Sequence, residues 1–406
     1  MLQNQSSRIF LGLGIGILAG TAINLFIPGE AKRFLDENIL RFAGTGFIRL
    51  VQFVVIPLVF TALVIGMSNI LDIRKVGKYS VKLLTLYLAT GFISLGLGLL
   101  VGFLLKPGRG VHMAYQEISA PEALTLTDWM LRVIPKNPFE AVTTGNMLQV
   151  IFSALLIGAG LTLAGEKGKP LLSFFESVYE VIIKVVGLIL KLAPVGVFAL
   201  MASVIADQGL GILKNLSLYV AGMFLAALVM GGGVYSLLLA LSGCKPMRFW
   251  KAFYPAFAFA FGTASSSASL PVAMDNAETR FGMKKDIIAF ALPFGTSLKK
   301  DAAMLLQSLS ALFVAQMAGI QLSSSQVLAI IISTVFVSFS TAGIPAGGLI
   351  MMSTVFTAAG LPLEGVVILA GVDRVTDTFR TALNVIGYTA NAAILESWEN
   401  RPPEKP

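Results

Sequence analysis

Five polar side chains recur along the last strongly apolar segment of the chain, residues 366–395, at spacings that place them on one side of a helix. They are Asp373, Asp377, Arg380, Asn384 and Tyr388, and at 3.6 residues per turn they fall within an arc of roughly 80°, with Thr381 at its border. An arginine offers a planar fork to a carboxylate, an aspartate offers a counter-charge to an ammonium group, and an asparagine can bridge neighbouring polar atoms. The stripe therefore predicts a site complementary to an acidic amino acid. The alternative is a structural stripe whose charges only pair with one another.

Three further ionisable residues lie near the middle of another apolar stretch, LPFGTSLKKDAAML at residues 292–305. They are Lys299, Lys300 and Asp301. Inside a membrane each charge costs at least ~2.5–3.5 kcal/mol, and such residues usually mark a substrate or ion path. Opposite charges about 4 Å apart attract by ~4 kcal/mol at an effective dielectric near 20, so pairing with carboxylates would offset that cost. The alternative is a pair of lysines that line a water-filled cavity and have no coupling role.

The composition requires a membrane protein, because 56% of the 406 residues are apolar, only 13% are charged and the mean hydropathy is +0.82. Apolar stretches of roughly 20 residues, the length that spans a bilayer as a helix, recur along the whole chain. The net charge of +8 comes from Lys and Arg clusters in the expected loops. The positive-inside rule explains these clusters better than nucleic-acid binding does, and it predicts that both termini are cytoplasmic. One cysteine and one histidine exclude a disulfide within the chain and argue against a Cys/His metal site.

The apolar pattern predicts an all-α polytopic fold with helical spans at about 8–28, 39–70, 77–106, 145–165, 170–206 and 213–242. Two later segments, 253–274 and 330–356, carry glycine, proline and hydroxyl residues between apolar flanks. Irregular backbone at membrane depth is tolerated only where it is buried or lines a cavity, and paired interruptions indicate inverted repeats in a transporter. We interpret both segments as re-entrant helical hairpins, in a fold with eight transmembrane helices. For either segment alone, a kinked helix is the alternative.

Several ordered motifs extend this interpretation. They are VIPLVFTALVIG, IPKNPFEAVTTGNMLQVIF, KLAPVGVFAL, SSSASLP, STAGIPAGG and DTFRTALNVIG. In these motifs nearly the whole chain resembles the glutamate transporter family, the dicarboxylate/amino acid:cation symporters. The resemblance implies a homotrimer that moves its substrate by an elevator mechanism. It also implies a scaffold formed by residues 1–76 and 107–206, a transport domain formed by 77–106 and 207–398, and a cytoplasmic tail at 399–406.

The resemblance also implies roles for individual residues. Asp377 would hold the amino group of the substrate and Arg380 its side-chain carboxylate. Thr381, Asn384 and the two hairpin tips would hold the rest, where the free N–H groups of helix N-termini favour an anion. The tip residues are Ser265, Ser266, Ser267, Thr341, Gly343, Ile344 and Gly348.

The chain departs from the sodium-coupled members of that family at the cation sites. Those members carry Asn-Met-Asp-Gly-Thr where this chain has Lys299, Lys300, Asp301, Ala302 and Ala303. Tyr388 replaces a sodium-coordinating aspartate, and Gly91 replaces a serine or threonine, whereas Tyr87 and Thr90 are kept. We hypothesise that Lys299, helped by Lys300, gives Asp301 and Asp373 the positive charge that bound sodium supplies elsewhere. Ala303 departs in turn from the threonine usual in carriers of acidic amino acids.

The sequence therefore predicts a sodium-independent secondary transporter of aspartate or glutamate in the inner (plasma) membrane, with no metal and no cofactor. Its partners would be a small-molecule substrate, membrane lipid and two further copies of the chain, and no nucleic acid. Proton-coupled symport of a dicarboxylate or an amino acid and uncoupled transport stay open, because a desolvated lysine readily loses its proton. A passive anion channel is a weaker alternative. A Ser/Lys hydrolase is weaker still, because it has no use for the stripe at Asp377 and Arg380.

Overall fold

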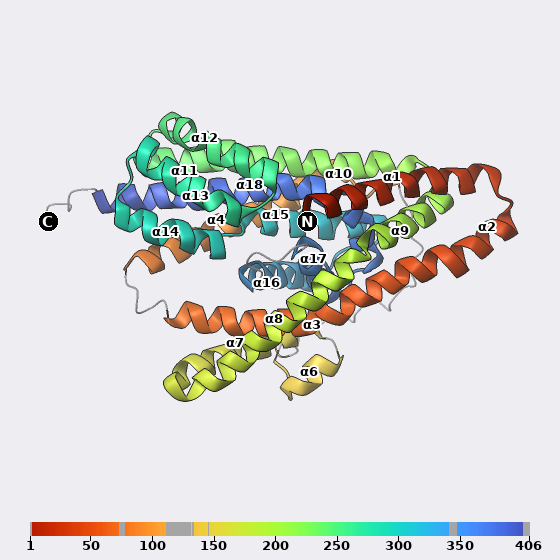
Figure 1. Ribbon diagram of the computed structural model, residues 1–406, viewed down its shortest axis with the longest axis horizontal. Coiled ribbons are helices and arrows are strands. Elements are labelled where there is room, and N and C mark those ends of the chain that lie inside the picture. Colours follow the sequence, from red (N-terminus) through yellow and green to blue (C-terminus); the bar gives the residue numbers. More distant parts are fainter. Residues whose placement is uncertain are drawn as a thin grey trace.

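The computed structural model describes residues 2–72, 78–110, 131, 134–144, 146–340 and 347–400, and none of these residues forms a β-strand. The chain is a bundle of helices of very different lengths (Figure 1). The all-α fold expected from the apolar pattern is confirmed.

The chain up to Leu228 supplies nine helices among the described residues. They are α1 (Leu2–Phe26), α2 (Gly29–Leu35), α3 (Arg41–Asp72), α4 (Lys78–Leu105), α6 (Pro138–Thr144), α7 (Met147–Ala164), α8 (Lys169–Lys191), α9 (Ala193–Gln208) and α10 (Gly211–Leu228). A π-helical stretch precedes α3 at Asp36–Leu40, and a 3₁₀ turn at Gly165–Gly168 joins α7 to α8.

The second half continues with shorter pieces and one long helix. They are α11 (Tyr235–Leu241), α12 (Pro246–Thr263), α13 (Ser266–Asp275), α14 (Lys285–Leu298), α15 (Asp301–Met317), α16 (Ser324–Ser340), α17 (Gly347–Ala359) and α18 (Glu364–Asn400). Two further π-helical stretches, Val229–Val234 and Asn276–Phe281, follow α10 and α13.

One predicted span is not a single helix. The segment 170–206 consists of α8 and α9, which are interrupted at Leu192. Pro194 lies in the first turn of α9, where its missing N–H group costs no helical hydrogen bond, so the helix restarts there instead of running through. The single continuous helix expected over 170–206 is therefore wrong.

By length and composition, two helical segments among the described residues could each cross a membrane on their own, Tyr79–Leu105 and Gly211–Leu241, and a third counts if one bent pair is taken as a single span. Shorter apolar helices occur at Leu11–Phe26, Phe53–Ser68, Ser324–Ser338 and Gly348–Ala359. The count of eight full spans stays a prediction.

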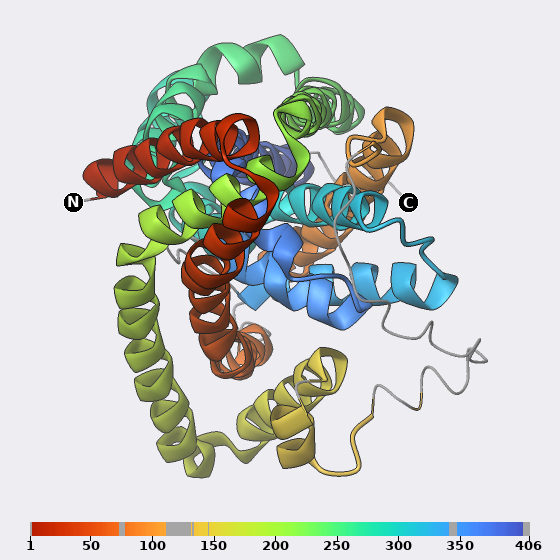
Figure 2. The same cartoon turned by 90° about the vertical axis from the view of Figure 1, so that its right-hand side faces the viewer.

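The helices pack around two main apolar clusters. The larger cluster joins α4, α10, α12, α14, α15 and α18, and the smaller one joins α3, α7 and α8. Helix α1 lies along α9, and α3 packs against α7, α8 and α9. Figure 2 shows α7 and α8, in yellow and yellow-green, at the periphery of the molecule. The long helix α18 thus runs through the larger packing unit.

In each segment predicted as a hairpin, two helices pack against each other, α12 against α13 and α16 against α17. Between α12 and α13 the chain turns at Ala264, whose φ of +49° is left-handed. Ser265 then caps α13, because its hydroxyl accepts a hydrogen bond from the Ala268 N–H at 3.2 Å. Residues 341–346, which lie between α16 and α17 in the sequence, are outside the described residues.

Candidate functional site

The helical chain breaks at the two lysines. Helix α14 ends at Leu298 and α15 begins at Asp301, while Lys299 is extended (φ −79°, ψ 108°) and Lys300 is irregular (φ −134°, ψ 38°). Neighbouring helices hold the new N-terminus. The Ser94 hydroxyl donates to the Asp301 carbonyl at 2.8 Å, and the Ala302 N–H donates to Asn384 Oδ1 at 3.1 Å. The break is thus bonded to both α4 and α18.

Lys299 is completely enclosed, with its side chain 0% exposed and that of Asp301 1% exposed. Its ammonium group forms an ion pair with Asp301 Oδ2 and donates a hydrogen bond to the Thr90 hydroxyl. The Tyr87 and Tyr235 rings flank it, each with its centroid 5.5 Å from Nζ, which is within the range of a cation–π contact. Lys299 therefore sits in a cage of one carboxylate, one hydroxyl and two aromatic faces.

Tyr235 is a part of this cage that the sequence did not reveal. Its hydroxyl donates to Asp301 Oδ2, the same oxygen that pairs with Lys299. Tyr235 follows directly after the π-helical stretch Val229–Val234, whose glycine triplet lies in an otherwise uniform apolar segment. That triplet was the available signal, because π-bulges often occur at functional sites.

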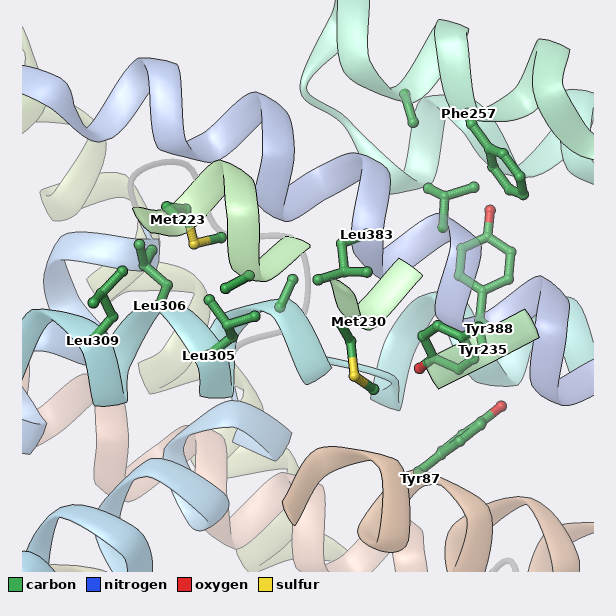
Figure 3. Close-up of a cluster of buried hydrophobic side chains, with 14 of the residues drawn as sticks. Tyr87, Met223, Met230, Tyr235, Phe257, Leu305, Leu306, Leu309, Leu383 and Tyr388 are labelled. Atoms are coloured by element: carbon green, nitrogen blue, oxygen red, sulfur yellow. The ribbon is translucent and has the colours of Figure 1, made fainter. Parts of the chain in front are cut away.

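A glycine on α18 closes the cage. A Cβ at Gly387 would lie 2.7 Å from the Tyr235 hydroxyl oxygen and 3.2 Å from Lys299 Cε. Helix α18 therefore approaches the lysine so closely that no side chain fits between them. Figure 3 shows Tyr87, Tyr235 and Tyr388 gathered at one end of the buried cluster that also contains Leu383 and Met230.

Lys300 points away from its neighbour. Its ammonium group donates to the Thr296 carbonyl at 2.9 Å, and the residue is 8% exposed. Among the described residues, neither Lys300 nor Lys299 forms an ion pair with Asp373. Asp373 lies instead against Gly348, where a Cβ would be 2.9 Å from its Oδ1. Of the predicted contacts between the lysines and the carboxylates, the structure thus shows the one between Lys299 and Asp301.

The polar stripe lies on one unbroken helix, α18. Arg380 donates from Nε at 3.0 Å and from Nη2 at 2.5 Å to the same Asp377 oxygen, Oδ1. Its Nη1 is buried and has no hydrogen-bond partner among the described residues. The side chains of Arg380 and Asp377 are only 12% and 19% exposed. Thr381, Asn384 and Tyr388 continue the stripe and are buried. The guanidinium is thus bound to the Asp377 carboxylate, and its Nη1 group can still donate hydrogen bonds.

Helix α17 abuts this stripe at Gly348. A Cβ at that position would collide with the Arg380 guanidinium, so a larger residue would force that side chain to move. The Gly348 carbonyl accepts a hydrogen bond from Gln307 Nε2 at 3.2 Å, and Gln307 is fully buried on α15. The sequence analysis missed Gln307, because a single amide in a long apolar helix has no distinguishing pattern.

The other predicted residues of the hairpin tips form no hydrogen bond with the polar stripe among the described residues. Ser265, Ser266 and Ser267 lie at the start of α13, which packs against α18, but no hydrogen bond links them to Asp377 or Arg380 among the described residues. Thr341, Gly343 and Ile344 lie outside the described residues.

Two small residues distinguish the surroundings of Asp301. A Cβ at Gly91 would lie 2.7 Å from Met304 Sδ and 3.7 Å from Asp301 Oδ1, so a thioether fills the space that a larger residue would need. Ala303 is buried within the smaller apolar cluster, beside Ile350 and Met351 of α17. Neither position offers an oxygen from its side chain.

Comparison with known proteins identifies the family. The sequence model of the sodium:dicarboxylate symporter family matches residues 6–398. The "Proton/sodium-glutamate symport protein" of Bacillus caldotenax is 34% identical over 98% of this chain and 95% of that protein. The "Proton/glutamate-aspartate symporter" of Bacillus subtilis (strain 168) is 32% identical over 95% of this chain and 93% of its own length.

A third relative is named for a different substrate. The "C4-dicarboxylate transport protein" of Rhodospirillum rubrum is 28% identical over 96% of this chain and 88% of that protein. These relatives are transporters, which sets aside the hydrolase alternative. The chain belongs to the sodium:dicarboxylate symporter family and is a multi-pass membrane transporter.

Proposed function

We propose that this protein is a secondary transporter of acidic amino acids, aspartate or glutamate, whose transport does not require sodium. In this proposal Lys299 and Lys300 supply fixed positive charge where sodium-coupled members bind cations. Asp301, Asp373, Tyr388, Tyr87 and Thr90 complete this pseudo-cation site.

The cage around Lys299 is the observation that carries the proposal. A hard cation such as sodium needs several converging oxygens, and the Asp301 carboxylate and the Thr90 hydroxyl are suitable ligands. Here both groups contact the lysine ammonium instead. A metal ion in the same place would have to displace a covalently attached cation and would be repelled by it. The cation at this position is therefore supplied by the chain itself.

The ion pair at Asp377 and Arg380 supports the choice of substrate. A bound amino acid with an acidic side chain would exchange this internal pair for two external ones, with its ammonium group on Asp377 and its carboxylate on Arg380. The substrates named for the relatives from both Bacillus species agree with that assignment.

The mechanism is proposed by resemblance to the family. Residues 77–106 and 207–398 form a mobile transport domain, and 1–76 and 107–206 form the scaffold of a homotrimer with cytoplasmic termini. The larger apolar cluster consists mainly of residues of the proposed transport domain and the smaller one mainly of residues of the proposed scaffold, and the two units meet where Ala303 and Met351 join the smaller cluster. An elevator-like movement of one unit against the other would carry the substrate across.

Uptake of labelled aspartate and glutamate into proteoliposomes tests the proposal. The external cation should be sodium, potassium or choline, each with and without a pH gradient. The expected result is saturable uptake at equal rates in the three cations. A steep sodium requirement would refute the cation-substitution role of Lys299, and conductance without saturable exchange would indicate a passive anion channel.

Proton-coupled symport of a dicarboxylate or an amino acid is the second candidate. The name of the Bacillus subtilis relative favours proton coupling, and that of the Rhodospirillum rubrum relative favours a dicarboxylate as substrate. In the same experiment, an inward proton gradient that accelerates uptake would support it. Equal uptake with and without the gradient would leave uncoupled transport.

A further inference from the structure

Exposed basic side chains gather at one end of the hairpin formed by α12 and α13. Residues 245–286 carry six basic and three acidic residues. One of the basic residues, Lys285, is paired with Glu278 at 3.0 Å. The other five are exposed and form no ion pair in the described part of the chain. Together they form the basic patch: Lys245, Arg248, Lys251, Arg280 and Lys284.

The two parts of the basic patch are joined by a direct contact. Its first three members lie at the start of α12, and the other two lie at the end of the π-helical stretch Asn276–Phe281 or just after it. Arg248 Nη2 donates a hydrogen bond to the Phe281 carbonyl at 2.6 Å. The same guanidinium lies over the Phe281 ring, 5.2 Å from its centroid. The five cations therefore belong to one surface, although they come from two segments.

An exposed apolar line leads away from the basic patch along α12. Met247, Tyr254 and Phe261 are seven residues apart, close to two helical turns, so they lie in one row. They are 65%, 60% and 45% exposed, while the other sides of α12 pack against α11, α13, α18 and the π-helical stretch. Lys251 is exposed on the same side, between Met247 and Tyr254. The charged end of the helix thus continues into an uncovered apolar surface.

This order of side chains matches the cross-section of a membrane leaflet. Lysine stems can extend along apolar surface and present their ammonium groups to phosphates, tyrosine is favoured at the level of the headgroups, and apolar side chains contact acyl chains. Figure 1 shows α12 at an edge of the molecule, at the same end as the C-terminus. A soluble anion would contact only the charges and would leave the apolar line uncovered. A lipid covers both.

We propose that the basic patch binds the headgroups of anionic phospholipids, whose acyl chains lie along Met247, Tyr254 and Phe261. Positive charge near a membrane surface attracts anionic lipid, and the five cations supply that charge. Because bound lipid stabilises the folded state by mass action, the lipid composition sets the stability of the α12–α13 hairpin. The inference goes beyond the proposed function, since it involves no residue of the substrate site or of the pseudo-cation site.

Binding of phosphatidylglycerol to the full-length protein in detergent tests this surface, with phosphatidylcholine as the zwitterionic comparison. The parent should prefer phosphatidylglycerol, and the preference should shrink as salt is raised. The triple variant Lys245→Gln, Lys251→Gln and Lys284→Gln keeps Arg248, which holds the Phe281 carbonyl. Each lost lysine should weaken phosphatidylglycerol binding about fivefold, and the triple variant should weaken it about 100-fold. Lys251→Gln alone should give the fivefold loss.

A matched control changes the net charge equally outside the basic patch. Lys136→Gln, Lys191→Gln and Lys214→Gln alter three exposed lysines and should leave phosphatidylglycerol binding as in the parent. Melting temperatures without lipid should be the same in the parent and both triple variants, which separates lost binding from lost folding. If the triple variant of the basic patch is less stable, the single variant Lys251→Gln decides.

Three outcomes would overturn the proposal. Equal phosphatidylglycerol affinity of the parent, the patch variant and Lys251→Gln would remove the basic patch from lipid binding. An equal loss in the control variant would show that only the net charge matters. Inorganic phosphate that displaces phosphatidylglycerol at matching concentrations would show a site for a soluble anion, with no contribution from the apolar line.

Discussion

Lys299 and Asp301 form a buried ion pair although only one residue separates them in the sequence. On a regular helix, residues two apart point to nearly opposite sides and cannot meet. They meet here because the helix is interrupted at Lys299 and Lys300, so that the extended backbone at Lys299 redirects its side chain. The broken helix and the ion pair therefore depend on each other.

Removing the cation should expose that dependence. Lys299→Met leaves the carboxylate of Asp301 buried without its counter-charge, and breaking a buried pair in this way costs ~3–5 kcal/mol. We expect a lower melting temperature in detergent and loss of transport in choline. In the double variant Lys299→Met with Asp301→Asn, much of the stability should return, because no isolated charge remains. Strictly additive losses in the two single variants and the double variant would contradict the pairing.

Two tyrosines of the cage provide a matched comparison. The Tyr235 hydroxyl donates to Asp301, whereas the Tyr87 hydroxyl has no hydrogen-bond partner among the described residues. Tyr235→Phe should therefore destabilise the protein by ~1.5–3 kcal/mol, as expected for a hydrogen bond to a charged group, while Tyr87→Phe should be nearly neutral. Both variants keep the aromatic face toward Lys299. Melting temperatures that fall equally in the two variants would show that the Tyr235 hydroxyl has no special role.

Close approach of α18 to Lys299 predicts a steric effect. Gly387→Ala adds a methyl group 2.7 Å from the Tyr235 hydroxyl oxygen and should displace the cage, lowering both stability and transport rate. Gly160→Ala in α7 is the control, because no atom lies within 4 Å of its added Cβ. In a helix interior that change should be neutral or stabilising by roughly 0.5–1 kcal/mol. A Gly387→Ala protein as stable and as active as this control would rule out the close packing.

Arg380→Ala tests the proposed recognition of the substrate. Loss of the guanidinium should weaken aspartate and glutamate by a factor of ~10–100, because a charge-assisted interaction is worth ~1.5–3 kcal/mol. Asparagine has no side-chain carboxylate and should lose far less. Competition of each amino acid against labelled aspartate measures the difference. Equal losses for acidic and neutral amino acids would remove Arg380 from recognition of the side chain.

The sequence was most informative where charges interrupt apolar stretches. The cost of a buried charge singled out Lys299, Asp301, Asp377 and Arg380, and the structure brings these residues into two ion pairs. It was least informative where a contact depends on local backbone geometry. Tyr235 enters the cage through a π-helical stretch inside a segment that reads as one regular span.

The direction of each lysine also depends on the backbone. Both lysines occupy the break between two helices, where the periodicity of a regular helix gives no guide to the orientation of a side chain. For that reason the separation of Lys299, toward Asp301, from Lys300, toward the Thr296 carbonyl, could not be predicted from the sequence.

A sodium titration of substrate affinity is the most direct test of the central claim that Lys299 occupies the place of a bound cation. The dissociation constant of aspartate should be measured on purified protein from zero to high sodium, at constant ionic strength with choline. Each coupled sodium ion would change the logarithm of that constant by one unit for every tenfold change in sodium. The account predicts a slope of zero, and a slope of one or more would contradict it.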